Sequence, residues 1–203
     1  MKDRPDLSAE DARQRLIDGN ERFLRGESRL AGVPREALAE LARGQRPFAT
    51  VLGCSDSRVS PERIFDAELG ELFVVRVAGN ILGPAVAGSL QYAGAHLQTP
   101  LFLVLGHDGC GAIQAALAAK QQGVKERSRI QLLVDDILPA LDELDPRLTT
   151  EAATAQAVEA NVRFTVRMIL ESPEGQARQA EGRVKILGAI YDIETGRVRF
   201  LDV

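Results

Sequence analysis

Three short apolar runs constrain the fold of this chain more than any other feature of its sequence. They span residues 48–53, 71–77 and 101–106. Each has the length and the β-branched content of a strand that is buried on both faces. Helical stretches follow these runs, at about 61–66, 84–97 and 111–122. Strands that alternate with helices in this way form parallel sheets, so the sequence predicts an α/β fold.

The two ends of the chain extend this pattern. Helices are expected at 8–24 and 34–43, within an N-terminal arm over residues 1–45, and at 129–144 and 151–171 after the third strand. Near the C-terminus, apolar stretches at 184–191 and 197–201 flank a turn. We therefore expect a single domain over 1–203 whose α/β core, residues 46–203, has four mostly parallel strands, an antiparallel edge strand and flanking helices.

Composition and charge exclude several classes of function. The net charge is −4, and the arginines are dispersed among carboxylates, so no nucleic-acid partner is expected. No apolar stretch approaches the roughly 18 residues that a membrane span needs. The opening residues 1–15 lack an apolar segment of signal-peptide length, which predicts a cytoplasmic protein.

Two motifs that can carry chemistry come directly after predicted strands. The first strand leads into Cys54-Ser55-Asp56-Ser57-Arg58, and the third leads into His107-Asp108-Gly109-Cys110. Open α/β sheets place their ligand sites at the carboxyl ends of parallel strands. The two motifs are therefore expected to meet at one edge of the sheet.

The donor set formed by Cys54, His107 and Cys110 favours zinc. Two thiolates and one imidazole suit this ion better than magnesium or calcium. A structural zinc site would normally close with a fourth Cys or His, but the chain has only two cysteines. Water is then expected in the fourth position, where zinc lowers its pKa from about 16 toward about 7.

Asp56 and Arg58 follow Cys54 closely enough to reach the same pocket. The Arg58 guanidinium can hold the Asp56 carboxylate ionised through two hydrogen bonds, so that it accepts a hydrogen bond from zinc hydroxide and directs the oxygen lone pair at the substrate carbon. If Arg58 released it, Asp56 could occupy the fourth zinc position and switch the site off. An ion pair that only fixes the loop is the alternative.

Two further features have other interpretations. Gly106, Gly109 and Gly111 suggest a phosphate-binding turn, but their order differs from G-x-G-x-x-G and no acidic residue follows where a ribose would need one. His96 falls on the predicted helix at 84–97, where a structural role is favoured over a proton shuttle.

These motifs resemble those of the β-class carbonic anhydrases, C-x-D-x-R after the first strand and H-x-x-C after the third. The resemblance covers nearly the whole chain, including the stretches 70–76, 78–80, 88–93 and 188–192. It implies a lyase that hydrates carbon dioxide reversibly to bicarbonate and a proton with one zinc ion per subunit. By the same resemblance, Cys54, His107 and Cys110 are the ligands, and Asp56 with Arg58 is the orienting dyad.

The resemblance also implies four substrate-binding residues. The Gly111 amide would help to position the substrate, and Gln45, Phe73 and Tyr92 would line the pocket. In the family the glutamine and the tyrosine reach a site across a dimer interface. This implies an obligate homodimer in which the N-terminal arm packs on the partner subunit, with a tetramer as the larger assembly.

The chain departs from the family pattern at two positions. Val77 stands where many relatives have an asparagine after the second strand, which removes a polar side chain near the pocket. Val51 stands where one subgroup has the tryptophan of a non-catalytic bicarbonate site, although Arg76 and Tyr191 match the other two positions. That form of bicarbonate inhibition is therefore not expected.

Two alternatives to carbon dioxide hydration stay open at this point. The resemblance extends to hydrolases of carbonyl sulfide and carbon disulfide, which use the same zinc constellation. A zinc module that is closed by Asp56 and only structural or sensing would need no pocket. The presence of Gln45, Phe73 and Tyr92 beside the dyad favours a working pocket.

Overall fold

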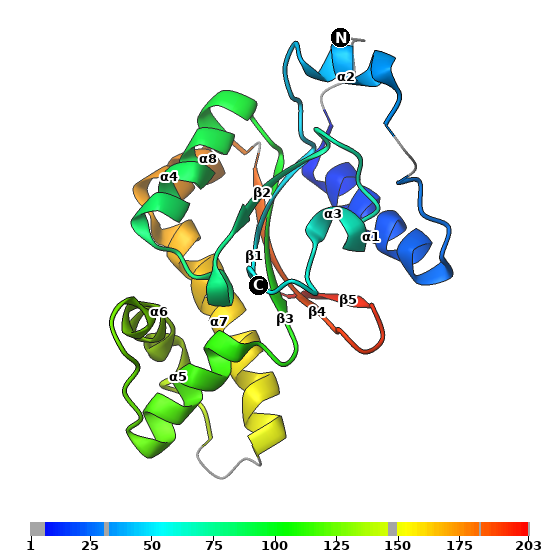
Figure 1. The fold of residues 1–203 in the computed structure, drawn as a ribbon. Helices are drawn as coiled ribbons and strands as arrows, with labels where there is room; N and C mark the ends of the chain where they lie inside the picture. The colour runs from blue at the N-terminus through cyan, green and yellow to red at the C-terminus, as the bar shows by residue number, and fades with distance from the viewer. Residues whose placement is uncertain (1–6, 31–32, 146–149, 183, 203) are drawn as a thin grey trace.

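The computed structural model describes residues 7–30, 33–145, 150–182 and 184–202. Residues 1–6, the start of the predicted arm, lie outside the described residues. One sheet has the strand order β2-β1-β3-β4-β5 (Figure 1). Its strands are β1 (Ala49–Gly53), β2 (Leu72–Arg76), β3 (Leu101–His107), β4 (Lys185–Tyr191) and β5 (Val198–Leu201). β1 to β4 run parallel and β5 pairs antiparallel with β4, which confirms the predicted fold class.

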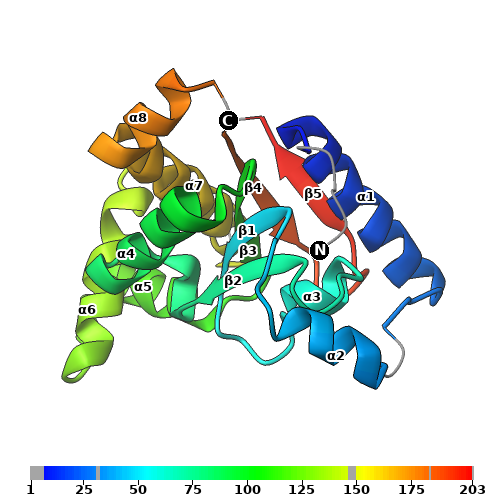
Figure 2. The same ribbon diagram turned by 90° about the horizontal axis from the view of Figure 1, so that it is seen from above.

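Helices cover both faces of the sheet. They are α1 (Ala9–Arg25), α2 (Arg35–Leu41), α3 (Pro61–Ile64), α4 (Pro84–Tyr92), α5 (Gly111–Gln122), α6 (Arg129–Ile137), α7 (Thr150–Glu171) and α8 (Pro173–Ala180). Figure 2 shows α4, α5 and α7 on one side of the sheet and α1 and α3 on the other. No helix in the described part of the chain is long and apolar enough to cross a membrane.

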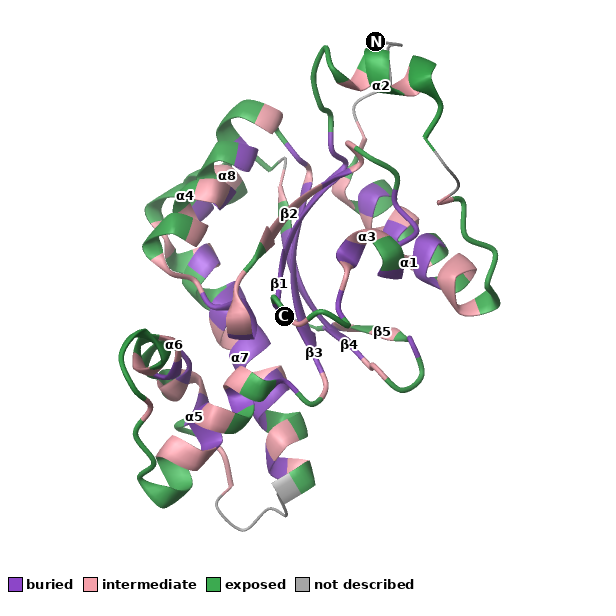
Figure 3. Ribbon diagram, in the orientation of Figure 1, coloured by how far each residue is buried: buried purple, intermediate pink, exposed green. Residues whose placement is uncertain are grey.

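β1, β3 and all but the first residue of β4 are buried, as the apolar runs at 48–53 and 101–106 predict (Figure 3). The prediction of burial on both faces was wrong for the run 71–77, because β2 is an edge strand and most of its residues are half-buried. In β3, Phe102 and Val104 join the core beneath α5 and α7, whereas Leu101, Leu103 and Leu105 join the core beneath α1 and α3. The two-residue period of a strand divides its side chains between two cores in this way. The ends of β1 and β3 are thereby fixed rigidly, and these ends carry the two motifs.

The helical bounds differ from the sequence expectations at three places. The stretch 84–97 is α4 followed by a π-helical turn (Ala93–Leu97), and 129–144 is α6 followed by a 3₁₀ turn (Leu138–Leu141). α8 was not expected. Its N-cap is Ser172, whose hydroxyl accepts the Gly175 N–H at 3.0 Å, and a proline follows at the first helical position.

The N-terminal helix α1 packs on the sheet of its own chain. A capping box begins it, in which the Asp11 N–H donates to the Ser8 hydroxyl at 3.1 Å. Buried Asn20 donates to the carbonyls of Ile64 and Gly196 at 3.2 and 2.9 Å. Helix α2 has no buried residue in the single chain. The packing of the arm on a partner subunit, and the division at residue 45, stay predictions.

Buried Asp66 ties the segment after α1 to the core. Its carboxylate accepts from Arg22 Nε at 2.6 Å, from the Ser28 hydroxyl at 2.8 Å and from the Arg29 N–H at 2.7 Å. Asp66 also has a positive φ of 44°, a conformation that short polar side chains tolerate better than others. The course of the chain toward α2 therefore depends on one acidic side chain beneath it.

Candidate metal centre

Two neighbouring parallel strands place the three candidate ligands. β1 and β3 pair with Gly53 opposite Leu105, so both strands end at the same edge of the sheet. Cys54 follows β1 directly and His107 is the last residue of β3. The chain then turns through Gly109, at a φ of 64°, to Cys110, the N-cap of α5. This turn brings the second thiol back to the strand ends.

The three ligand atoms form one buried cluster. All of them lie within 4.8 Å of one another, and the Cys54 and Cys110 sulfur atoms are 3.9 Å apart. A tetrahedral zinc ion with Zn–S bonds of about 2.3 Å separates two sulfur ligands by about 3.8 Å. The spacing of the sulfur atoms thus fits zinc without rearrangement.

The imidazole of His107 is oriented as a metal ligand. Its Nδ1 lies 2.9 Å from the Asp108 carbonyl oxygen, which can only accept, so Nδ1 carries the proton. Nε2 is then left with a lone pair, and it is buried without any hydrogen-bond partner. An unpaired buried nitrogen is costly, and a metal ion would satisfy it. The residues present therefore fit zinc in both donor type and geometry.

Electrostatics inside the cluster also favour a cation. The hydrogen bond from Cys110 lowers the pKa of Cys54 below its usual value, whereas the bond to Cys54 and burial together raise that of Cys110. A negative charge on Cys54 therefore opposes a second one on Cys110. A dication stabilises both thiolates and removes this conflict.

Asp56 and Arg58 form a bidentate ion pair at the rim of the cluster. Arg58 Nε and Nη2 donate to the two carboxylate oxygens at 2.9 and 2.7 Å, and the Arg58 N–H adds a third bond at 3.0 Å. These bonds hold the pKa of Asp56 well below its usual range. Oδ2 of Asp56 lies 4.0 Å from His107 Nε2. The carboxylate is thus ionised, close to the ligands and held by the guanidinium.

Arg76 fixes the loop that carries Cys54, a role that the sequence analysis missed. Its Nε donates to the Cys54 carbonyl at 3.0 Å and its Nη2 to the Asp56 carbonyl at 2.7 Å. As the last residue of β2, Arg76 pairs with Gly53 in the sheet. The sequence does contain one signal for this role. Arg76 lies at the end of the predicted strand next to the one that leads into Cys54, so its side chain can reach the backbone carbonyls of that loop.

The predicted pocket residues occupy different places in the single chain, and Phe73 packs against the core that contains Cys54 and Cys110. Phe73 pairs with Thr50, several residues before the strand end, and its ring centroid is 6.0 Å from that of Tyr92. Tyr92 is 47% exposed and also contacts the His96 ring at 4.9 Å. Gln45 is exposed ahead of β1. Gly111, the first residue of α5, directly follows Cys110.

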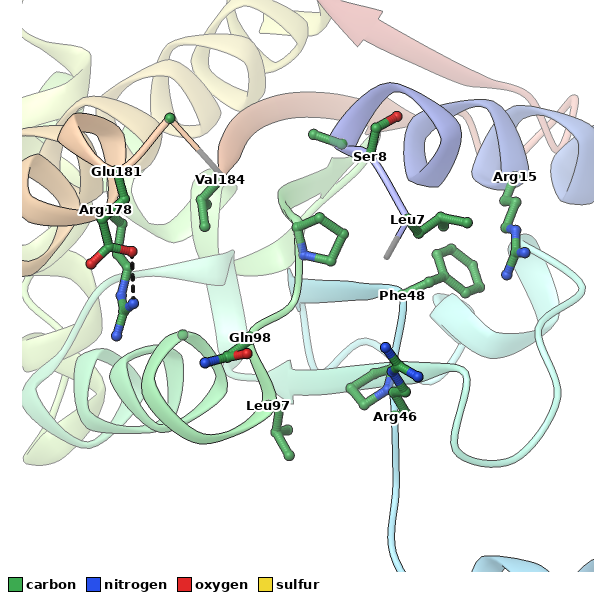
Figure 4. A pocket seen from close by; sticks show the side chains of 15 residues that line it. Leu7, Ser8, Arg15, Arg46, Phe48, Leu97, Gln98, Arg178, Glu181 and Val184 are labelled. Carbon is green, nitrogen blue, oxygen red and sulfur yellow. Dashed lines mark hydrogen bonds and ion pairs between the residues drawn. The ribbon is translucent and has the colours of Figure 1, made fainter. Parts of the chain in front are cut away.

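A hollow lies at the other end of the parallel strands from the metal cluster. Its volume is about 520 Å³, and Figure 4 shows Arg15, Arg46 and Phe48 on one side of it and Arg178 on the other. Phe48 directly precedes β1 and Val184 directly precedes β4, so this hollow is at the amino ends of the strands. It is separate from the metal cluster.

Comparisons with known proteins agree with this geometry. The family model described as carbonic anhydrase matches residues 49–198. Carbonic anhydrase 2 of Mycobacterium tuberculosis is 38% identical over 188 residues, which cover 92% of this chain and 90% of that protein. The carbonic anhydrase of Mycolicibacterium smegmatis is also 38% identical, over 90% of this chain and 88% of its own length.

Solved structures show the same relationship. The β-carbonic anhydrase CcaA superposes with a TM-score of 0.75 at 30% identity, over 94% of this chain and 95% of its own. The Coccomyxa β-carbonic anhydrase, solved in complex with acetazolamide, has a TM-score of 0.77 at 30% identity, with coverages of 92% and 84%. The chain therefore belongs to the carbonic anhydrase family, within its β class.

Proposed function

We propose that this carbonic anhydrase hydrates carbon dioxide reversibly, to bicarbonate and a proton, with one zinc ion held by Cys54, His107 and Cys110. The unpartnered Nε2 of His107, buried against two sulfur atoms 3.9 Å apart, is the observation that carries the proposal. Zinc bound there supplies a Lewis acid that makes a nucleophile of water near neutral pH.

Asp56 and Arg58 orient the reacting water. Arg58 keeps the Asp56 carboxylate ionised and fixed by two side-chain hydrogen bonds. The carboxylate then accepts a hydrogen bond from the nucleophilic water and turns the oxygen lone pair toward the substrate carbon. The Gly111 N–H, in the first turn of the 12-residue helix α5, has no acceptor within that helix and is suited to donate to a substrate oxygen.

A second copy of the chain completes the pocket in this proposal. Tyr92 is 47% exposed, Gln45 is exposed and α2 buries no side chain in the single chain. A homodimer would cover these groups and bring Gln45 and Tyr92 to the partner's metal centre, with Phe73 beside them; a tetramer would repeat the dimer. The cytoplasmic location stays a prediction.

Stopped-flow carbon dioxide hydration by the zinc-loaded protein tests this function. We expect one zinc per subunit and fast hydration, with both lost in Cys54→Ser and both kept in the matched control Ser55→Ala, which changes the exposed neighbour. Inhibition by acetazolamide is expected as well, because the Coccomyxa relative was solved with that compound.

Two results would contradict the proposal. Release of sulfide from carbonyl sulfide without hydration of carbon dioxide would assign the centre to a hydrolase. Tightly bound zinc with no activity toward either substrate would instead identify a closed structural module.

A further inference from the structure

A chain of hydrogen bonds connects helix α7 to the sulfur of Cys54. The Gly79 N–H donates to Cys54 Sγ at 3.4 Å, and the Gly79 carbonyl accepts from Asn161 Nδ2 at 2.8 Å. Gly79 lies in the short turn Ala78–Asn80 that follows β2. One residue therefore receives a hydrogen bond from α7 and donates one to a candidate zinc ligand.

The backbone of Gly79 needs such an anchor. Its φ of 72° lies in the left-handed region, which glycine adopts freely and which other residues avoid. A Cβ atom there would lie 2.9 Å from Ile137 Cδ1 and 3.2 Å from Ala112 Cβ, so these side chains would have to shift to make room for it. Glycine has the least restrained dihedral angles of all residues. The direction of its N–H is consequently set by whatever holds the residue from outside.

Asn161 holds Gly79 in place from helix α7. Its side chain is buried, with 1% exposure, and it approaches the turn from 82 positions away in the sequence. A buried amide that lost its acceptor would carry a desolvation penalty, so the bond to the Gly79 carbonyl is strongly favoured. Asn161 thus fixes the position of Gly79, and with it the N–H that faces Cys54.

An N–H that points at a metal-bound thiolate changes the donor strength of the sulfur. The hydrogen bond stabilises negative charge on sulfur and withdraws electron density from the bond to the metal. Partners beyond the ligands commonly alter metal affinity or activity by about 10- to 100-fold. The contact at 3.4 Å therefore affects how strongly the Cys54 sulfur binds a metal ion.

We propose that Asn161 is a positioning residue of the metal centre, which holds Gly79 so that its N–H sets the donor strength of the Cys54 sulfur. The proposal rests on the zinc site of the proposed function. It assigns a role in the centre to a side chain on α7, which contributes no ligand.

Thr165 provides a matched control. It lies one turn further along α7, is also 1% exposed and donates its hydroxyl to the carbonyl of Asn80 at 3.4 Å. Thr165→Val therefore removes a buried bond from the same helix to the same turn, but leaves the Gly79 carbonyl with its donor. A role confined to stability would make Asn161→Leu and Thr165→Val alike at the metal.

The experiment compares these variants with the wild type after cobalt substitution. For Asn161→Leu we expect the thiolate-to-cobalt charge-transfer band at longer wavelength, because the sulfur loses its hydrogen bond. We also expect the zinc affinity, measured in competition with a chelator, to change by about 10-fold. Thr165→Val should keep the wild-type band and affinity. Asn161→Asp, which is the same size but sets an oxygen against the Gly79 carbonyl, should shift the band as well and provides a second test.

The outcomes separate the two proposals. A wild-type band in both folded Asn161 variants overturns the positioning role, as does an equal shift in Thr165→Val. If the wild type binds one zinc and hydrates carbon dioxide while the variants are unshifted, only the positioning role fails. A wild-type chain that binds neither zinc nor cobalt overturns both proposals.

Discussion

Replacing Asp66 by asparagine should measure how firmly the segment after α1 is tied to the core. The wild-type carboxylate is fully buried and accepts bonds from Arg22, Ser28 and the Arg29 backbone. Asparagine keeps the shape of the side chain, removes its charge and leaves one oxygen as an acceptor. The guanidinium groups of Arg22 and Arg29 would then lose their buried partner.

The ion-pair geometry and the pKa shift of Asp66 give similar values for the folding free energy that Asp66→Asn would lose. Removing one partner of a buried ion pair costs about 3–5 kcal/mol. Arg22 and Arg29 are 25% and 47% exposed, and water recovers part of this loss, so we expect about 2–3 kcal/mol. Independently, burial opposes the charge of Asp66, but the hydrogen bonds from Arg22, Ser28 and Arg29 outweigh it and lower its pKa to about 2. Compared with about 3.9 in an unfolded chain, that shift is worth roughly 2.5 kcal/mol.

Urea unfolding at a fixed subunit concentration measures the loss. At pH 7 Asp66→Asn should unfold about 2–3 kcal/mol more easily than the wild type. Because the pKa is lowered by folding, the contribution is fully present above about pH 4 and is lost as the pH falls toward 2. The difference between the two proteins should therefore narrow over this window.

The control for this prediction is Asp142→Asn, which removes the ion pair with Lys120 on a side chain that is 74% exposed. We expect a change below about 0.5 kcal/mol there. A loss as small as this for Asp66→Asn at pH 7, or a loss of the same size at pH 7 and pH 2, would refute the reasoning.

Three further predictions concern the metal centre and the sheet. Arg58→Ala frees Asp56 from its bidentate partner and should lower the rate of carbon dioxide hydration about 10- to 100-fold with zinc content unchanged. Stopped-flow kinetics and metal analysis measure these two quantities, and full activity would contradict the orienting role of Asp56 and Arg58. Removing zinc with dipicolinate should lower the melting temperature by several degrees, because the ion binds only the folded ligand set, and readdition of zinc should restore it. Gly106→Ala would place a Cβ 2.5 Å from Val162 Cγ2, between β3 and α7, and should destabilise the fold by about 1–3 kcal/mol in urea. Gly88→Ala, with no atom within 4 Å of its added Cβ, should not destabilise it.

The sheet and the metal cluster could be predicted from the sequence because both follow from short-range patterns. Apolar runs of strand length identified the strands, and parallel strands necessarily end at one edge. Cys54 and His107 come at two such ends, so their meeting required no knowledge of side-chain packing. The thiolate and imidazole donors then limited the choice of metal.

Contacts between distant polar residues could not be predicted in this way. Asn161 lies in a mixed stretch of α7 where a polar residue usually faces solvent, and nothing in the sequence relates it to Gly79. Asp66, after a short helix, equally resembles a surface carboxylate. Such groups are buried because of where tertiary packing places their partners, and hydrophobic periodicity does not contain this information.

Helix α8 was missed for a local reason. The sequence predicts a helix that ends at residue 171, before Ser172-Pro173, and α7 does end at Glu171. The same two residues also cap a new helix, because serine accepts a free N–H and proline suits the first turn. Ser-Pro after a helix is equally compatible with a second helix and with a loop, so the dipeptide alone does not distinguish them.

The pairing of β1 with β3 has a consequence for how the chain reaches its native state. Cys54 and Cys110 are 56 positions apart, and they meet only when Gly53 lies opposite Leu105. A slip of one residue between the strands would turn every side chain to the other face and separate the donors. Only chains with a correctly aligned central sheet would therefore present both sulfur donors to a zinc ion.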